Sequence, residues 1–242
     1  MNLNPPFPKC YKTSSKPHKF CPGCGHGITL KELGFAIDEL GIQKKSVLGI
    51  DIGCSLLAWD YFDIDTVQTH HGRTVPVMSG YKLIKPKKVA LAYLGDGGGY
   101  AIGLQSLLTA ANRNDPITVI LVNNTLYGMT GGQMAPTTLI GEITSTTPSG
   151  RNPEEKGQPF LGPELIKCLP NKKSFVARTT VNEPLSLRQT LKKAISHQIT
   201  KNSFSFVEVL STCPTNWKKN SSDSIEYLEK SMQDYYPLGV FK

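Results

Sequence analysis

Two motifs in the middle of the chain contain the residue types that hold a metal-bound diphosphate. A Gly-Asp-Gly run at 95–97 ends one apolar segment, and an Asn-Asn pair at 123–124 ends the next. Glycines let the backbone approach a phosphate closely, and the first N–H groups of a following helix bind the anion. Magnesium prefers hard oxygen ligands, which Asp96, Asn124 and the backbone carbonyl of Leu126 can supply. The pattern predicts a magnesium-bound diphosphate, with a ligand-free turn as the alternative.

Four of the six cysteines form a second candidate site. Cys21 and Cys24 are spaced as C-x-x-C, and Cys54 and Cys213 each follow a predicted strand. These positions can converge at one edge of a sheet, where four thiolates hold either an iron–sulfur cluster or a zinc ion. The C-x-x-C pair taken alone is also compatible with thiol redox chemistry. The other two cysteines have no such pattern, and we expect ordinary thiols at both, namely Cys10 and Cys168.

A third candidate is the His-His-Gly-Arg run at 70–73. Neighbouring side chains of an extended segment point to opposite sides, so one imidazole can face a site while the other faces solvent. Donating a proton or binding an anion is one interpretation, and a hydrogen-bonded structural histidine is the other. His26, which follows the C-x-x-C pair, is expected to pack near the cysteines rather than to serve as a ligand.

The elements that position these residues follow from the apolar pattern. Strands are predicted at 46–51, 88–94, 117–122, 175–181 and 204–210, and helices at 100–112, 184–199 and 225–232, with one more before Gly41. Strands alternating with helices predict an α/β fold with a mainly parallel sheet, whose carboxyl ends form the ligand-binding edge. The predicted buried faces of two helices are Ala101, Leu104, Leu108 and Ala111, and Leu187, Leu191, Ile195 and Ile199. Residues 130–160 are expected to form a long functional or partner-bound loop.

Composition narrows the class of protein. The chain has 242 residues and a net charge of +8, but its lysines are scattered and no basic run is interleaved with aromatic residues. This argues against nucleic acid; the charge indicates a solvated surface or a match to an acidic partner such as ferredoxin. No run approaches the roughly 20 apolar residues of a membrane span, and no signal peptide is evident, so we expect a cytoplasmic protein. We predict an irregular proline-rich arm at 1–20 and a single domain at 21–242.

The order of these motifs, extended by the run YGMTGGQ at 127–133, resembles the β subunit of 2-oxoacid:ferredoxin oxidoreductases over residues 20–242. The resemblance implies a thiamine-diphosphate-binding fold, in which a mainly parallel sheet is flanked by helices. It implies thiamine diphosphate and Mg²⁺ as cofactors, and a 4Fe-4S cluster on Cys21, Cys24, Cys54 and Cys213. One departure is Gly98, which stands where an acidic residue is common in that family.

The resemblance also assigns roles to residues. His71 and Met129 are the catalytic candidates, with core packing as the alternative for Met129, and Thr130 is placed to bind the diphosphate. The cofactor-binding residues that it implies are Ile52, Gly53, Cys54, Ser55, His70, His71, Gly72, Arg73, Gly95, Gly97, Gly98, Gly128, Met129 and Thr130.

The implied reaction is the oxidative decarboxylation of a 2-oxoacid to acyl-CoA and CO₂, with ferredoxin as electron acceptor. An α subunit is expected to supply the pyrimidine-binding half-site and the activating glutamate, and γ and ferredoxin-like δ subunits are expected as well, so the chain alone should be inactive.

Segments 133–138, 213–217 and 237–242 resemble the type that acts on 3-methyl-2-oxobutanoate, and Leu57 and Met129 are expected to form an apolar pocket. A 2-oxoglutarate enzyme, a non-catalytic zinc-stapled interaction subunit and a thiol oxidoreductase are the alternatives.

Overall fold

The centre of the molecule is built from short apolar strands that are buried on both faces. The computed structural model describes residues 7–12, 14 and 18–242. All residues of β1 (Ser46–Ile50), β4 (Thr118–Asn123) and β8 (Ser205–Leu210) are buried, and β3 (Val89–Gly95) is buried up to its last residue. Continuous apolar runs of this kind are typical of parallel strands covered by helices on both sides.

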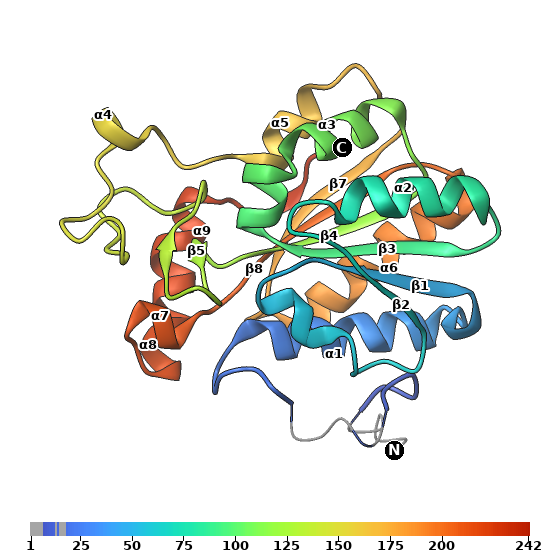
Figure 1. Cartoon of the computed structure of the whole chain (residues 1–242), viewed down its shortest axis with the longest axis horizontal. Helices are drawn as coiled ribbons and strands as arrows, with labels where there is room; N and C mark the ends of the chain where they lie inside the picture. Colours follow the sequence, from blue (N-terminus) through green and yellow to red (C-terminus); the bar gives the residue numbers. More distant parts are fainter. Residues whose placement is uncertain (1–6, 13, 15–17) are drawn as a thin grey trace.

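These strands belong to a seven-stranded sheet in the order β2-β1-β3-β4-β8-β7-β9 (Figure 1). It is completed by β2 (Asp65–Gln68), β7 (Phe175–Thr180) and β9 (Gly239–Val240). All neighbouring strands are parallel except β7 and β9, which are antiparallel. The carboxyl ends of the parallel strands therefore lie at one edge of the sheet, on the left in Figure 1.

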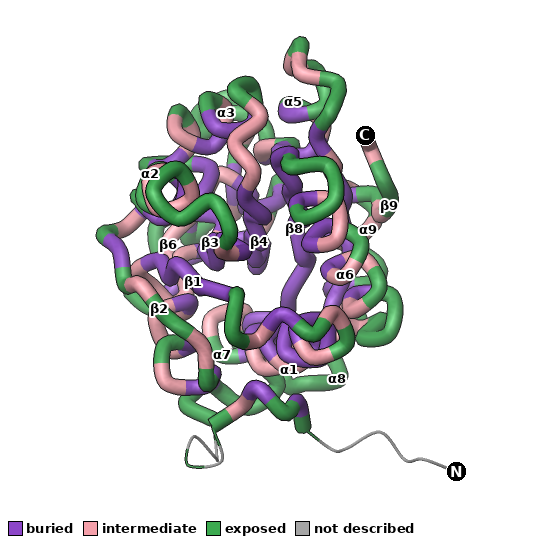
Figure 2. The backbone as a smooth tube through the Cα atoms, turned by 90° about the vertical axis from the view of Figure 1, so that its right-hand side faces the viewer, coloured by how far each residue is buried: buried purple, intermediate pink, exposed green. Residues whose placement is uncertain are grey.

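Helices cover both faces of the sheet. One face is covered by α1 (Gly25–Glu39) and α6 (Pro184–Lys201), and the other by α2 (Thr74–Ile84), α3 (Leu104–Arg113) and α5 (Gly162–Cys168). Figure 2 shows the buried strands between these layers. Successive side chains of β3 pack alternately: Leu91 and Tyr93 lie against α1 and α6, and Ala92 and Leu94 face the opposite layer. The predicted α/β fold with a mainly parallel sheet is confirmed.

The helix that follows β3 differs from its prediction. It begins with a π-helical turn, Gly98–Ile102, before α3. A π turn inserts an extra residue into the helical repeat and shifts the phase of everything that follows. The predicted face was therefore partly wrong. Ala111 is buried as expected, and Leu104 and Leu108 are half-buried, but Ala101 is exposed and the other buried positions of α3 are Leu107 and Ala110.

The end of α6 also differs from its prediction. Ile199 is 46% exposed, whereas Gln198 is buried beside it. The Gln198 side chain accepts a hydrogen bond from the Thr118 hydroxyl (2.7 Å) and donates one to the Pro116 carbonyl (2.9 Å). A satisfied amide replaces an apolar contact here because the helix end meets polar backbone at the start of β4.

Short elements occupy the carboxyl edge and the outer surface. A 3₁₀ turn, Gln43–Lys45, precedes β1, and another, Cys54–Ala58, follows it. The loop predicted at 130–160 includes part of a small hairpin, β5 (Leu126–Tyr127) with β6 (Gln133–Met134), and the short helix α4 (Pro153–Lys156). The chain continues after β8 through α7 (Pro214–Trp217), α8 (Ser221–Tyr227), the π turn Leu228–Met232 and α9 (Gln233–Tyr235).

Both ends of the described chain pack on the chain itself. Cys10 is buried, with its thiol donating to the Gly34 carbonyl (3.4 Å), and Tyr11 forms a β-bridge with Phe62. Residues 1–6, 13 and 15–17 of the predicted arm lie outside the described part, so the division into 1–20 and 21–242 stays a prediction. The C-terminal segment closes the sheet as β9. Among the described residues, no helix combines the length and apolar character that crossing a bilayer requires.

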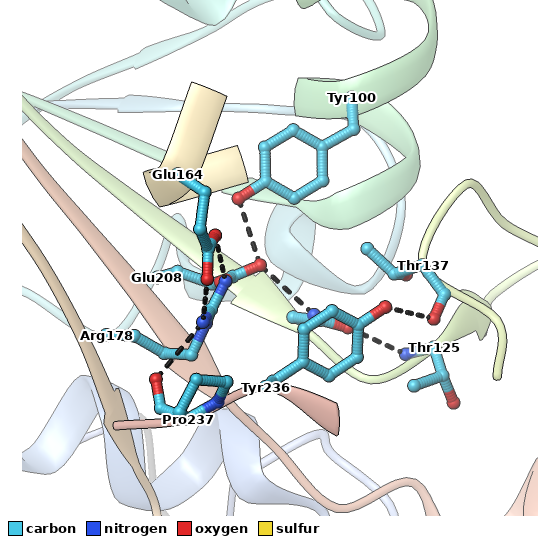
Figure 3. Close-up of polar contacts among 9 residues, drawn as sticks. Tyr100, Thr125, Thr137, Glu164, Arg178, Glu208, Tyr236 and Pro237 are labelled. Atoms are coloured by element: carbon cyan, nitrogen blue, oxygen red, sulfur yellow. Dashed lines mark hydrogen bonds and ion pairs between the residues drawn. The ribbon is translucent and has the colours of Figure 1, made fainter. Parts of the chain in front are cut away.

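A buried ion network connects the sheet to its surroundings (Figure 3). Glu208 in β8 accepts hydrogen bonds from Arg178 Nε (2.5 Å), the Tyr100 hydroxyl (2.9 Å) and the Asn123 amide (3.1 Å). The other end of the Arg178 guanidinium binds both oxygens of Glu164 at 2.7 Å. Every charge in this network has a partner, which burial requires because an isolated ion in a protein interior is costly.

Replacing Arg178 with methionine should therefore lower the free energy of unfolding by about 3–5 kcal/mol, because Glu208 would remain buried without its counter-ion. Urea denaturation measures the loss. The matched control is Lys230→Met, which breaks an exposed ion pair with Glu226 and should leave the midpoint unchanged. A loss of under about 1 kcal/mol for Arg178→Met would show that the network does not stabilise the fold.

Candidate functional site

A cavity of about 300 Å³ opens at the carboxyl edge of the sheet, beyond β1, β3 and β4. In open α/β sheets this edge is where ligands bind. The cavity brings together most of the residues predicted from the sequence: Ile52, Gly53, Cys54, Ser55, His71, Gly95, Asp96, Gly97, Gly98, Asn124, Leu126, Gly128, Met129 and Thr130 all line it. Motifs that are distant in the sequence therefore share one wall.

Three of the predicted cofactor-binding residues do not reach this wall. His70 and Arg73 are exposed, and the Arg73 guanidinium donates to the Ile102 carbonyl (3.3 Å). Gly72 is buried behind the wall, where its N–H donates to Asp51 Oδ1 (2.7 Å). Of the two adjacent histidines, His71 is the one that faces the cavity.

Asp96 is the acidic group of the cavity wall. It is 2% exposed and accepts hydrogen bonds from the Gly97 N–H (2.8 Å) and the Thr137 hydroxyl (2.5 Å). Burial raises the pKa of its carboxyl to about 7. A cation bound next to the carboxylate would offset this desolvation. The Asn124 amide and Leu126 lie in the same wall, so the oxygen donors suit a magnesium ion that bridges to a diphosphate.

The backbone around Asp96 leaves room for an anion. A side chain at Gly97 would have its Cβ 2.1 Å from the Tyr127 ring, so this position requires glycine. The bare backbone of Gly97 and Gly98 lies at the start of a helix that opens with a π turn, a feature frequently found at functional sites. Free N–H groups at a helix start are suited to phosphate.

Hydrogen bonds from outside the cavity hold its polar wall in place. The Tyr236 hydroxyl donates to the Thr137 carbonyl (2.6 Å), and the Thr137 side chain binds Asp96. The Asn123 side chain accepts from the Thr125 N–H (3.1 Å) while its amide binds Glu208 (Figure 3). The C-terminal segment thereby helps to position Asp96, and the buried ion network helps to position the strand end that carries Asn124.

Thr125 has a left-handed backbone, with φ of 62°, directly after Asn124. This conformation is unusual for a β-branched residue and needs support from its surroundings. Its hydroxyl donates to Glu142 Oε1 (2.6 Å) and accepts from the Trp217 indole (3.3 Å). Burial raises the pKa of Glu142 to about 7. Neither Glu142 nor Trp217 had a local sequence signal for this role.

The four predicted cluster cysteines share one electrostatic neighbourhood beside the cavity. Cys21 and Cys24 form a tight turn, with the Cys24 N–H donating to the Cys21 carbonyl (3.1 Å). Burial is the largest cause that raises the pKa of Cys24 to about 12 and of Cys54 to about 11, and repulsion from the other thiols adds to it. Burial likewise raises the pKa of Cys213. Thiols of this kind become thiolates when a metal centre binds them.

The described residues do not form a preassembled metal site, either for a single ion or for a cluster. Within residues 7–12, 14 and 18–242, no three His, Cys, Asp or Glu side chains converge as ligands of one metal ion. A tetrahedral zinc with bonds of about 2.3 Å would draw its sulfurs close together. Cys54 lines the cavity, and its sulfur lies 3.2 Å from the position that a Cβ at Gly128 would occupy.

Three residues of the cavity wall were not predicted as part of it: His26, Val122 and Tyr127. His26 Nδ1 lies 2.6 Å from the Tyr93 hydroxyl, and its ring stacks on Phe20 at 5.2 Å. Burial lowers the pKa of His26 to about 4, so its imidazole is neutral. Its place directly after the C-x-x-C pair was the available signal, and Tyr127 lies inside the YGMTGGQ run.

Known proteins resemble this chain over most of its length. The family model described as "Thiamine pyrophosphate enzyme, C-terminal TPP binding domain" matches residues 51–209. Ketoisovalerate oxidoreductase subunit VorA of Methanothermobacter marburgensis is 44% identical over 226 residues, which cover 92% of this chain and 47% of that protein. This chain thus spans about half the length of the ketoisovalerate oxidoreductase subunits that it matches.

Two further relatives are covered over more of their length. The 2-oxoglutarate synthase subunit KorB of the same organism is 36% identical, covering 95% of this chain and 78% of that protein. A solved 2-oxoglutarate:ferredoxin oxidoreductase from Magnetococcus marinus, with 2-oxoglutarate, coenzyme A and succinyl-CoA bound, aligns with a TM-score of 0.80 and 30% identity. That alignment covers 93% of this chain and 73% of that one.

Glu142 should make stability depend on pH. Its folded-state pKa of about 7 lies above the ordinary 4.5, so its contribution to stability is full below about pH 4.5 and is lost as pH rises through about 7. Unfolding free energies of the wild type and Glu142→Gln should therefore diverge in that window, with the wild type losing stability relative to the variant. Glu154→Gln, on the exposed helix α4, is the matched control. Parallel curves for wild type and Glu142→Gln would contradict the prediction.

Proposed function

The chain belongs to the thiamine pyrophosphate enzyme family and, within it, to the subunits of 2-oxoacid:ferredoxin oxidoreductases, and from that premise we propose that it is the β subunit of such an enzyme. The proposed reaction converts a 2-oxoacid, coenzyme A and oxidised ferredoxin into acyl-CoA, CO₂ and reduced ferredoxin. One observation carries the proposal. The buried Asp96 and the Cys54 thiol lie in the walls of one cavity, so a metal-bound diphosphate and a redox centre would be neighbours.

The residues present fit the cofactors of this reaction. We assign Mg²⁺ to Asp96, Asn124 and the Leu126 carbonyl, and the diphosphate to the glycine-rich helix start at 97–98. We assign a 4Fe-4S cluster to Cys21, Cys24, Cys54 and Cys213, whose mutual repulsion a cluster would relieve. When bound, thiamine diphosphate supplies a nucleophilic carbon and an electron sink. The chain itself would hold the diphosphate end, and Gly128, Met129 and His71 would line the space left for the ring.

A partner subunit is needed to complete this site. Among the described residues that line the cavity, Asp96 is the sole carboxylate, and the proposed cation would occupy it, so none of them is left to activate an aminopyrimidine ring. We therefore propose that an α subunit supplies the activating glutamate and the pyrimidine-binding half-site. Exposed apolar side chains support this docking: Met129 is 45% exposed in the cavity wall, and Ile140 and Ile143 in the following loop are exposed.

Further partners follow from the same proposal. We infer γ and ferredoxin-like δ subunits, which would pass electrons on to ferredoxin, and the net charge of +8 suits an acidic acceptor of this kind. We also keep the proposed division into an arm at 1–20 and a thiamine-diphosphate-binding domain at 21–242.

The proposed substrate is 3-methyl-2-oxobutanoate. Within the part of the chain that the structure describes, neither Lys nor Arg lines the cavity, whereas the second carboxylate of 2-oxoglutarate calls for a cation. Met129 supplies an apolar wall; Leu57, which we expected beside it, lies outside the lining. The alternative substrate is 2-oxoglutarate, with the cation supplied by the partner.

Turnover by the assembled complex tests the reaction and the substrate together. We expect kcat/KM for 3-methyl-2-oxobutanoate to exceed that for 2-oxoglutarate by about tenfold or more, because a second carboxylate would be left unpaired. The isolated chain should turn over neither acid. An equal or higher kcat/KM for 2-oxoglutarate would contradict 3-methyl-2-oxobutanoate as the substrate. Turnover by the isolated chain would contradict the proposal that an α subunit completes the site.

Iron analysis tests the cluster assignment. Anaerobically purified protein should contain about four irons and four acid-labile sulfides per chain, and Cys21→Ser should lose them because a ligand is missing. Cys168→Ser removes an exposed thiol outside the quartet and serves as the matched control, with iron content unchanged. Stoichiometric zinc without sulfide, despite anaerobic handling, would favour the zinc-stapled interaction subunit instead.

A further inference from the structure

A second buried carboxylate lies behind the cavity wall and has no assigned role. Asp51 directly follows β1, and its side chain is 0% exposed. Its Oδ1 accepts hydrogen bonds from the Gly72 N–H (2.7 Å) and the Thr74 hydroxyl (3.2 Å). Its Oδ2 has no hydrogen bond, yet it lies 3.3 Å from His71 Nδ1. A buried carboxylate oxygen without a hydrogen bond needs a partner, and desolvation by burial raises the pKa of Asp51.

The surroundings of His71 fix which ring nitrogen holds the proton. Nδ1 lies 3.2 Å from the Ile52 carbonyl and 3.3 Å from Asp51 Oδ2. Both neighbours accept hydrogen bonds, so Nδ1 must be a donor. The reverse arrangement, with a proton on Asp51 and a lone pair on Nδ1, would turn that lone pair toward the Ile52 carbonyl. Nδ1 therefore binds acceptors behind the cavity wall. Nε2 is the nitrogen left to contact a ligand in the cavity that His71 lines.

Gly98 provides the space for this carboxylate. A Cβ at position 98 would lie 1.9 Å from Asp51 Oδ2, whereas its distance to His71 Cε1 would be an ordinary 3.5 Å. The backbone of Gly98 does not have a positive φ, so its conformation does not require glycine. The Asp51 carboxylate occupies the space where a side chain at position 98 would begin.

We propose that Asp51 is a positioning residue for His71: its carboxylate holds the imidazole with the proton on Nδ1, so that Nε2 faces the cavity, and Gly98 is glycine to admit that carboxylate. The neutral imidazole of histidine in water favours a proton on Nε2, so the protein inverts the ordinary preference. The use of Nε2 toward substrate or cofactor rests on the proposed function, but the tautomer itself does not.

Nitrogen NMR of the full chain, labelled with ¹⁵N-histidine and assigned with the His71→Asn variant, reads the tautomer directly. We expect His71 Nδ1 to have the chemical shift of a protonated nitrogen and Nε2 that of an unprotonated one. Asp51→Asn retains an acceptor for Gly72 and Thr74 but offers an N–H donor to His71, so it should shift the population toward the Nε2-protonated form. A wild-type ring with an unprotonated Nδ1, or a tautomer unchanged by Asp51→Asn, would overturn the proposal.

Moving the carboxylate from position 51 to position 98 tests whether Asp51 sets the His71 tautomer through its charge or only fills space. Asp51→Ala should lower the population of the Nδ1-protonated tautomer, because the Ile52 carbonyl alone is left to accept from Nδ1. Asp51→Ala with Gly98→Asp should restore that population, because the new side chain starts in the vacated space. Asp51→Ala with Gly98→Asn is the matched control and should not restore it. Rescue by both double variants, or by neither while both remain folded, would contradict a role for the charge.

The same variants distinguish this inference from the proposed function. In the assembled complex, Asp51→Asn should lower kcat/KM, and Asp51→Ala with Gly98→Asp should recover part of it. An inactive wild-type complex whose His71 keeps the Nδ1 proton would count against the proposed function alone. An active complex in which Asp51→Asn changes neither the tautomer nor kcat/KM would count against this inference alone.

Discussion

The site depends on a carboxylate that is buried at the centre of the sheet. Glu208 has no exposure, and its two oxygens bind Arg178, Tyr100 and Asn123, which come from β7, the helix after β3 and the end of β4. Because an unpaired charge in this position would cost several kcal/mol, these elements have essentially one arrangement that satisfies it. That arrangement fixes where the Gly-Asp-Gly turn and the Asn-Asn pair meet.

Carboxyl and thiol groups, which are negative when ionised, lie around one cavity near Glu208. Asp96, Glu142, Cys24 and Cys54 all have their pKa raised, and in each case burial is the largest cause. A wall that desolvates acidic groups without enclosing cations of its own is suited to bound metal centres. The proposed magnesium-bound diphosphate and iron–sulfur cluster would meet that need at two neighbouring points. The positive net charge of the chain does not indicate that acidic groups gather around this cavity.

The sequence predicted the architecture and most of the wall because both have local signals. Apolar runs marked the strands, and their last residues marked the edge where Asp96, Asn124 and Cys54 meet. The predicted buried face of the helix after β3 was partly wrong because a π turn has no signal in an apolar pattern. Asp51, Glu142 and the Arg178–Glu208 pair were not foreseen, since single polar residues in or beside apolar strands acquire partners only through tertiary contacts. The departure at Gly98 was visible, but its reason lay in a carboxylate distant in the sequence.

Electron paramagnetic resonance of the assembled complex tests the central claim. The claim is that electrons leave the cofactor site through the proposed 4Fe-4S cluster, which the four cysteines beside that site would hold. The complex would be mixed anaerobically with thiamine diphosphate, Mg²⁺ and the 2-oxoacid, without an electron acceptor. We predict a reduced 4Fe-4S signal that depends on the 2-oxoacid. In Cys54→Ser the signal of this chain should be lost, and the clusters of partner subunits should no longer be reduced by the 2-oxoacid, although a chemical reductant still reduces them. A substrate-dependent spectrum identical in wild type and Cys54→Ser would contradict the account.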